Sequence, residues 1–311
     1  MKYALTYGRR RATSIGLLMV TLIDVSASAQ ELEPRQYSNA PIGMNFLVAG
    51  YANSSGGVLV DPSIALDNAE LEADGPVVGY ARALSLGGLS AKIDAGVGHA
   101  CLSGSADYEG EHVAGHVCGL SDAKTRLAVN FIGAPALRPQ EFAAYRQNLI
   151  VGASLQLGVP VGDYDGQKLI NVGANRWSAK MEVGFSKTLP RNWILEVSLA
   201  GTFYEANDDF RSGRTREQDP IYALQLHAVR SLPSGIWIAV DSTHYRGGQT
   251  ATDGVQNANL QSNDRLGLTF SVPINRSQSV KAYYSSGVST RTGTDFDTVG
   301  AVWQYRWGGK P

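Results

Sequence analysis

Hydrophobic and polar residues alternate with a period of two along most of the chain. In the segment 89–101, for example, Leu89, Ala91 and Ile93 take one face of an extended chain, while Ser90, Lys92 and Asp94 take the other. The same alternation recurs at 124–131, 149–159, 193–203, 265–272 and 298–307. A helix would repeat every 3.6 residues, whereas side chains of a strand alternate between two faces. The pattern therefore predicts an all-β chain.

Strand length points to a particular kind of β protein. The pattern predicts twelve strands, near 42–52, 76–86, 89–101, 118–131, 146–160, 176–187, 192–205, 220–231, 235–246, 264–273, 278–288 and 297–307. Strands of soluble sheets have about 5–6 residues, while a tilted strand needs roughly 9–11 residues to cross a bilayer. The predicted strands reach this length. We therefore expect an all-β transmembrane, antiparallel up-and-down β-barrel of about 12 strands.

The predicted connections alternate between long and short. The long, polar ones are 53–75, 102–117, 161–175, 206–219, 247–263 and 289–296. The short ones are Gly87-Gly88, 188–191, 232–234 and 275–277, and one longer connection, 132–145, interrupts the rule. Outer-membrane barrels have short periplasmic turns and longer extracellular loops, and an even strand count returns both chain ends to the periplasm. A misplaced strand at 132–145 would change that count.

The N-terminus predicts export. Lys2 and the Arg9-Arg10-Arg11 run precede an apolar stretch that ends at Ala27-Ser28-Ala29. This is the arrangement of a secretory signal peptide, and the apolar stretch is too short for a membrane-spanning helix. We therefore predict a signal peptide at 1–29, an N-terminal periplasmic segment at 30–41, a barrel at 42–307 and a C-terminal tail at 308–311. The predicted location is the bacterial outer membrane.

Charge and hydropathy agree with this prediction. Removal of residues 1–29 leaves 23 basic and 27 acidic side chains, a net charge of −4. This balance excludes a nucleic-acid footprint, so no nucleic-acid partner is expected. The mean hydropathy of −0.13 resembles that of a soluble protein. A transmembrane barrel has such values too, because only every second residue of a strand meets lipid.

Aromatic residues near the ends of the predicted strands are candidates for interfacial girdles. They are Tyr51, Tyr80, Trp177, Phe203, Tyr222, Tyr245, Tyr284 and Trp303. Ordinary packing within a sheet explains any one of them equally well.

Charged residues on the polar faces of the strands are the candidate lining of the lumen. They are Lys92, Asp94, Lys124, Arg126, Glu182, Glu196, Asp241, Arg265, Lys281 and Arg306. A wetted and mutually paired lining is the simplest interpretation, and a charge ring that selects permeating solutes is the sharper alternative.

One short segment gathers both cysteines and three of the five histidines: His99, Cys101, His112, His116 and Cys118. A disulfide between Cys101 and Cys118 would suit an oxidising compartment and would stabilise the loop by ~3 kcal/mol in the chain-entropy model. A metal site is a second hypothesis, although the spacing matches no standard zinc motif. Free thiols are the third. All three remain open on the sequence alone.

Catalytic motifs do not emerge from the sequence. It has no G-x-S-x-G, H-E-x-x-H or phosphate-binding loop, and a pairing of His227 or His244 with a nearby serine has no support from spacing. We therefore predict that the chain is not an enzyme, and we expect no catalytic residues, cofactor or metal.

Four long segments carry a resemblance to a known family: LSDAKTRLAVNFIGAPAL (120–137), 149–187, DPIYALQLHAVRSLPSGIWIAVDSTHYRGG (219–248) and 265–307. Over roughly 42–307 the chain resembles the proteobacterial outer-membrane family labelled "MetA-pathway of phenol degradation". The resemblance implies an outer-membrane barrel with a role in uptake of aromatic or other hydrophobic compounds. It implies no catalytic residues, and the Cys/His segment lies outside the shared pattern. Trp303, Tyr305 and Trp307 alternate as in a closing strand, but four residues follow them.

These observations predict a monomeric or weakly oligomeric channel for diffusion of small hydrophobic or aromatic molecules. Twelve strands enclose a narrow or partly plugged lumen, and the long first loop at 53–75 is the candidate plug. The expected partners are outer-membrane lipid, the machinery that assembles outer-membrane barrels, and the permeating molecules. A surface barrel without transport activity, such as an adhesin or structural protein, is the first alternative, and a membrane-embedded hydrolase is the second.

Overall fold

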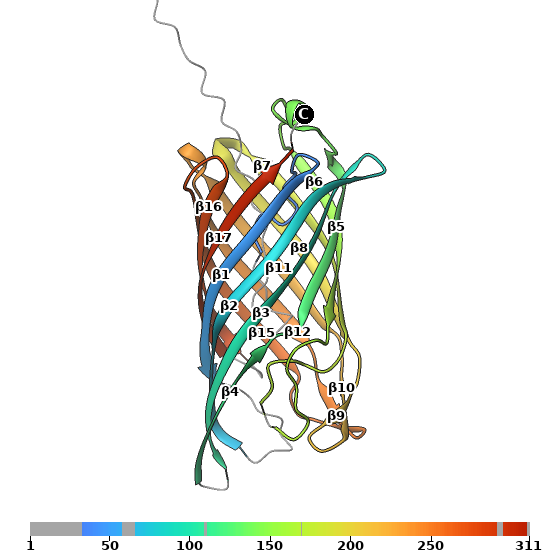
Figure 1. Cartoon of the computed structure of the whole chain (residues 1–311), viewed down its shortest axis with the longest axis vertical. Coiled ribbons are helices and arrows are strands. Elements are labelled where there is room, and N and C mark those ends of the chain that lie inside the picture. The colour runs from blue at the N-terminus through green and yellow to red at the C-terminus, as the bar shows by residue number, and fades with distance from the viewer. Residues whose placement is uncertain (1–32, 58–65, 109–110, 169, 291–294, 310–311) are drawn as a thin grey trace, which may run out of the picture.

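A closed β-barrel forms the body of the molecule (Figure 1). The computed structural model of the chain describes residues 33–57, 66–108, 111–168, 170–290 and 295–309. The predicted signal peptide, 1–29, lies outside the described residues. Among the described residues, no helix is both long enough and apolar enough to cross a membrane.

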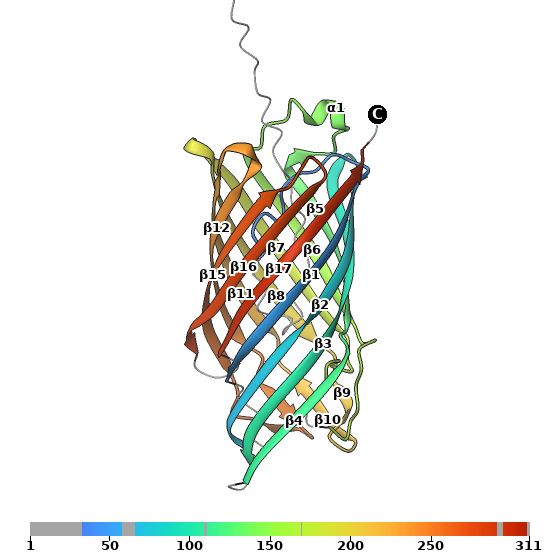
Figure 2. The same ribbon diagram turned by 60° about the vertical axis from the view of Figure 1, so that its left-hand side comes forward.

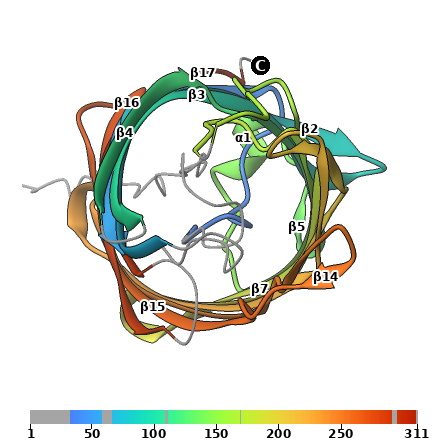
Figure 3. The same ribbon diagram turned by 90° about the horizontal axis from the view of Figure 1, so that it is seen from below.

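Twelve strand positions make up the wall. They are β1 (Met44–Gly57), β2 (Leu66–Leu86), β3 (Leu89–Tyr108), β5 (Ala123–Pro135), β6 (Leu149–Val159), β7 (Ser178–Leu189), β8 (Trp193–Tyr204), β11 (Ile221–Ser231), β12 (Trp237–Gly247), β15 (Gln261–Pro273), β16 (Gln278–Thr290) and β17 (Asp295–Gly308). Each pairs antiparallel with its neighbours along the chain, and β1 pairs with β17 from Met44↔Gly308 to Gly57↔Asp295. Figure 3 shows the resulting closed ring.

Strand β4 (Glu111–Leu120) does not add a thirteenth position. Both β4 and β5 pair with β3. Strand β4 pairs with residues 99–108 of β3, and β5 pairs with residues 89–96. They therefore share one place in the wall, interrupted at Ser121-Asp122. The predicted fold class, an antiparallel up-and-down barrel of about 12 strands, is confirmed.

The wall has an apolar outer face and a polar inner face. Along β7, Met181, Val183 and Phe185 are exposed on the outside, whereas Lys180 and Glu182 are buried inside. Leu266, Leu268 and Phe270 of β15 repeat the pattern. This is the sidedness of a barrel whose outer face meets lipid.

The strands continue beyond the apolar zone into regions predicted as loops. Most of 53–75 belongs to β1 and β2, and most of 102–117 belongs to the hairpin β3–β4, which protrudes at the end opposite the C-terminus (Figure 1). Polar side chains support the extension, since Asn53 donates to Glu72 across the β1–β2 pair at 2.8 Å. Period-two apolar patterning cannot reveal such strands, because both of their faces are polar or wet.

The other predicted long connections contain small strands. The segment 206–219 holds β9 (Asn207–Phe210) and β10 (Arg214–Gln218), and 247–263 holds β13 (Thr250–Thr252) and β14 (Val255–Gln256). These four strands form a second sheet at the same end as the β3–β4 hairpin. We call this end the long-loop end.

Tight connections close the opposite, short-turn end. Gly87 and Gly88 both have positive φ, 58° and 83°, as a two-residue hairpin turn requires. Short 3₁₀ turns, Pro190–Asn192 and Pro233–Gly235, make two other connections. The exceptional connection after β5 carries the helix α1 (Pro139–Phe142), which Figure 2 shows near the C-terminus. No strand is misplaced there.

Six of the aromatic girdle candidates are exposed on the outside: Tyr51, Tyr80, Trp177, Phe203, Tyr222 and Tyr284. Trp303 is half-buried and stacks on Tyr305. The expectation for Tyr245 was wrong, since its side chain is 0% exposed. Tyr245 has the same parity as Asp241 along β12 and therefore points into the lumen, where its hydroxyl accepts a hydrogen bond from Asn263 at 3.1 Å.

We expect Leu199→Arg to destabilise the barrel in lipid by ~2–4 kcal/mol, because Leu199 lies near the middle of β8 with 57% of its surface exposed on the outer face. Urea unfolding in lipid vesicles measures the loss, and Leu199→Phe is the matched apolar control. Equal stability of the two variants would contradict a lipid-facing position for Leu199.

Candidate functional site

The lumen contains most of the charged residues predicted to line it. Eight of the ten are buried on the inner face: Lys92, Asp94, Arg126, Glu182, Glu196, Asp241, Arg265 and Lys281. Lys124 and Arg306 are half-buried near opposite ends of the barrel, and Arg306 donates to the carbonyl of Arg276 at 2.8 Å. Four of the eight, Lys92, Arg126, Glu182 and Glu196, bind the N-terminal part of the chain.

Residues 33–40 occupy the lumen and are all buried. We call them the plug segment. This position differs from the periplasmic location expected for 30–41. The candidate plug 53–75 does not take this role in its described parts, 53–57 and 66–75, since these belong to β1 and β2. The polar sequence of 33–40 gave no sign of this location, because partners in the lumen are visible only in three dimensions.

The Tyr37 ring packs against the barrel wall at a pair of glycines. Gly152 of β6 and Gly184 of β7 lie directly opposite each other, and a Cβ atom on either would collide with the Tyr37 ring. The Tyr37 hydroxyl donates to Glu182 at 3.0 Å, while the Tyr37 carbonyl accepts from Asn130 at 3.0 Å. The glycine pair therefore makes a flat seat where the ring comes close to the backbone.

Charged lumen residues hold the rest of the plug segment. Arg126 forms an ion pair with Glu33 and a second with Asp94 at 3.1 Å. Lys92 donates to the carbonyl of Gln36. The backbone NH of Arg35 donates to Glu196, and the Arg35 guanidinium lies 5.6 Å from the centre of the Trp237 ring. Buried charges need such partners, and the segment supplies them.

An apolar cluster anchors the plug segment toward the short-turn end. Ala40 packs with Phe46 and Val48 of β1 and with Ala81, Ala83 and Val302 of neighbouring strands. Phe142 of α1 packs against the same cluster, and the NH of Ile42 donates to the carbonyl of Leu137 at 2.9 Å. The α1 connection therefore folds against the chain where the plug segment leads into β1.

The remaining lumen residues pair with the wall itself. Asp241 bonds to His227 at 2.7 Å and accepts from Thr269 at 2.8 Å. Arg265 donates to Ser285 and to the carbonyl of Phe296, and Lys281 lies over the Tyr283 ring. The hydrogen-bond partners shown for His227 and His244 are Asp241 and Asp264, so neither histidine is placed against a serine in the described contacts.

A cavity of about 600 Å³ lies at the long-loop end. The inner side of β2, β3 and β4 forms one wall, and the connection after β6 together with β9 and β10 forms the other. Its apolar lining includes Leu71, Leu102, Val113, Val117, Ile170 and Phe210. Ile170 packs close to Gly104 of β3, so the connection after β6 touches the hairpin. We call this cavity the long-loop pocket.

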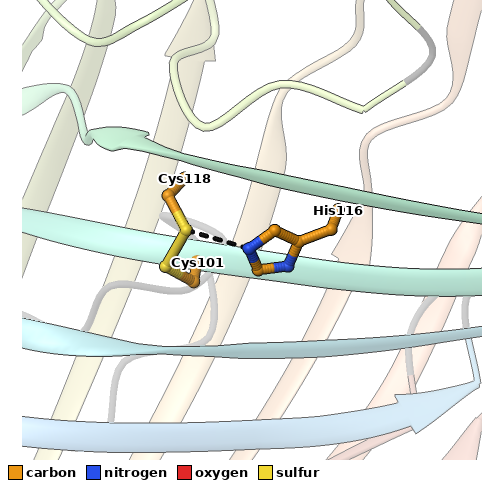
Figure 4. A group of neighbouring side chains, drawn as sticks. All are labelled: Cys101, His116 and Cys118. Carbon is orange, nitrogen blue, oxygen red and sulfur yellow. Dashed lines mark hydrogen bonds between the residues drawn. A yellow bond between two sulfur atoms is a disulfide. The ribbon is translucent and has the colours of Figure 1, made fainter.

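Cys101 and Cys118 form a disulfide that ties the two strands of the hairpin together (Figure 4). The imidazole Nε2 of His116 lies 3.2 Å from the Cys118 sulfur, and its Nδ1 bonds to Ser103 at 2.9 Å. These three side chains are also the described group closest to a metal-binding arrangement. A metal would bind to cysteine thiolates, and both cysteine sulfurs are bonded to each other here. Of the three hypotheses for this segment, the structure therefore has the disulfide.

Two residues important to the long-loop pocket, Arg176 and Arg216, were not singled out from the sequence. Arg216 lies in the predicted loop 206–219, where no periodicity assigns it a face, and Arg176 is the first residue of the predicted strand 176–187, where the alternation has not yet begun. The charge balance of 176–216 gave no signal either, because its five arginines are matched by five acidic residues.

Comparison with known proteins places these features in context. The family model described as "Putative MetA-pathway of phenol degradation" matches residues 62–304. No curated protein sequence matches the chain.

Solved structures share the fold. The crystal structure of an outer membrane channel from Pseudomonas putida F1 is similar with a TM-score of 0.76 and 20% identity, over 89% of this chain and 100% of that one. The β domain of the Bordetella autotransporter BrkA has a TM-score of 0.53 and 14% identity, over 85% and 100% of the two chains. At such identities the likeness shows the barrel fold alone.

We expect Gly184→Ala to displace Tyr37, because the new Cβ would occupy the space of the ring. Single-channel conductance in planar bilayers should rise relative to the native protein. Gly201→Ala on the neighbouring strand is the matched control, since its Cβ would meet side chains at an ordinary 3.4 Å. Unchanged conductance in Gly184→Ala would show that the Tyr37 seat does not keep the lumen closed.

We expect the double variant Cys101→Ser, Cys118→Ser to keep the barrel but loosen the hairpin. Loss of ~3 kcal/mol would accelerate hydrogen exchange of the amides in 102–117 by on the order of 100-fold. Exchange in β7 and β8 is the internal control. Equal protection of the hairpin with and without the disulfide would contradict this role.

Proposed function

The chain belongs to the family described as "Putative MetA-pathway of phenol degradation", and we propose that it is an outer-membrane channel for diffusion of small hydrophobic or aromatic compounds. The long-loop pocket carries this proposal. It is a mostly apolar cavity with a few polar groups, and its volume lies within the ~300–1,000 Å³ typical of small-molecule sites.

The orientation of the barrel follows from its two ends. Short turns, α1 and the plug segment lie toward one end, and the protruding hairpin and the second sheet lie at the other. Outer-membrane barrels direct their short turns to the periplasm. In this orientation the long-loop pocket faces outward and receives compounds from outside the cell, and the outer surface of the barrel contacts outer-membrane lipid after insertion by the barrel assembly machinery.

Passage toward the periplasm meets the plug segment. The segment is held by Tyr37 on its glycine seat, by ion pairs and by the apolar cluster around Ala40. In this proposal solutes pass when the segment shifts, which restricts the channel to small molecules and to low conductance. The polar lumen side chains freed by that shift, such as Arg126 and Glu182, would then line a wetted path.

A surface barrel without transport activity is the competing function, and the protruding β3–β4 hairpin is the feature that favours it. A partner-binding barrel would need the hairpin but not a movable plug segment. A membrane-embedded hydrolase would need a nucleophile beside His227, whose described hydrogen-bond partner is Asp241.

We expect a strain lacking this protein to take up a labelled neutral aromatic compound, such as benzyl alcohol, more slowly than the parent at low external concentration. Growth on aromatic carbon sources should fall in parallel. Complementation with the native gene should restore uptake, while Leu102→Asp should restore it only partly, because a charge would enter the apolar pocket lining.

The matched measurement is uptake of a small sugar, which should not change in any of these strains. Normal aromatic uptake in the deletion strain would contradict the proposal and favour the surface-barrel alternative. Cleavage of an ester by the purified protein, abolished by replacement of one serine, would favour the hydrolase.

A further inference from the structure

Two arginines lie together at the long-loop pocket. Arg176 lies two residues before β7, and Arg216 is the middle residue of β10. Each guanidinium is stacked on an aromatic ring: Arg176 lies 4.7 Å from the centre of the Tyr204 ring, and Arg216 lies 4.9 Å from that of Phe210. Stacking fixes the plane of each guanidinium, which prepares both groups to bind a planar anion.

The charges lining the pocket are mostly positive. Lys168, Arg176 and Arg216 line it together with one carboxylate, Glu70 of β2. Lys168 pairs with Asp165 at 3.7 Å, so its charge is partly balanced locally. The positive charges of the two arginines act on each other, so an anion bound between them would be attracted by both.

The side chain that accepts a hydrogen bond from Arg176 is neutral, although the charges of Arg216 and Asp122 also act on Arg176. Its Nη2 donates to the side-chain carbonyl of Gln218, and its buried Nη1 has no hydrogen-bond partner. Burial and the positive charge of Arg216 lower the pKa of Arg176 to about 10. A guanidinium remains protonated at neutral pH under these conditions, so Nη1 is a charged donor left without an acceptor.

We propose that the long-loop pocket binds a small amphipathic organic anion, an aromatic or aliphatic carboxylate, with its carboxylate at Arg176 and Arg216 and its apolar body against Leu102, Val117 and Ile170. The inference rests on the proposed function and narrows its substrate class. A planar carboxylate matches the guanidinium fork, and the apolar walls disfavour strongly hydrated anions that carry no apolar body.

The two arginines of the pocket do not belong to the wall that crosses the membrane. Arg176 and Arg216 lie outside the twelve wall strands, and the disulfide fixes the hairpin that supplies Val113 and Val117. Substitutions at the arginines therefore leave the barrel intact. The faster migration of unheated protein in SDS gels, a property of folded outer-membrane barrels, checks this for each variant.

Calorimetry on the purified, detergent-folded full chain tests the proposal with three probes: benzoate, the neutral benzyl alcohol, and acetate. We expect benzoate to bind at least ~10-fold more tightly than benzyl alcohol, because it adds a charge-assisted bond to the same ring. Acetate, which has no apolar body, should bind too weakly to detect.

Four variants locate the site. Arg176→Gln and Arg216→Gln should each weaken benzoate binding ~10-fold or more and leave benzyl alcohol unchanged. Arg216→Lys should recover part of the benzoate affinity, since it restores charge without the fork. Arg214→Gln is the matched control on the same strand, because Arg214 is exposed, pairs with Asp253 at 3.6 Å and is not part of the pocket lining.

Each outcome decides the proposal. Benzoate binding that is tighter than benzyl alcohol and lost in the two Gln variants supports it. Equal binding of both aromatics, unaffected by the Gln variants, overturns the anion site but leaves an aromatic channel standing. Binding of neither aromatic overturns the inference, and the cellular uptake of benzyl alcohol then decides the proposed function separately.

Discussion

The pairing of β1 with β17 is the contact on which the rest of the structure depends. Backbone NH and carbonyl groups that face hydrocarbon must find partners within the protein, so an open sheet edge is not tolerated there. Fourteen consecutive residue pairs, from Met44↔Gly308 to Gly57↔Asp295, remove both edges. Closure also separates a lipid-facing surface from an enclosed interior. Every feature of the lumen follows from that separation.

Closure of the barrel leaves an interior that must be filled and whose charged side chains need partners. A ring of twelve strands is too wide for its own side chains to fill, yet its inner face carries buried charges such as Arg126, Glu182 and Glu196. The plug segment provides both volume and partners. Its Tyr37 ring fills the notch at Gly152 and Gly184, while its backbone and Glu33 satisfy charged wall residues. Wall and plug segment are therefore complementary in shape and in charge.

The sequence predicted the barrel well, because the outer face enforces a strict period: Met181, Val183 and Phe185 could be placed from alternation alone. Prediction from the sequence failed for several residues that do not face lipid, because the strict period of the outer face does not constrain them. Tyr245 was a girdle candidate because of its position near a strand end, although its parity along β12 places it inside. The plug segment was missed because its partners are distant in sequence, and no local pattern encodes a contact such as Tyr37 with Glu182, 145 residues away.

The location of the plug segment has a consequence for how the molecule assembles. Residues 33–40 lie just before β1, and β1 forms a seam with β17, the wall strand at the far end of the chain. Closing that seam brings together the two most distant strands, which makes it the slowest pairing on entropic grounds. While the seam is open, the segment beside it can settle against β6 and β7. Filling of the interior before the final join is therefore the order that chain entropy favours in this topology.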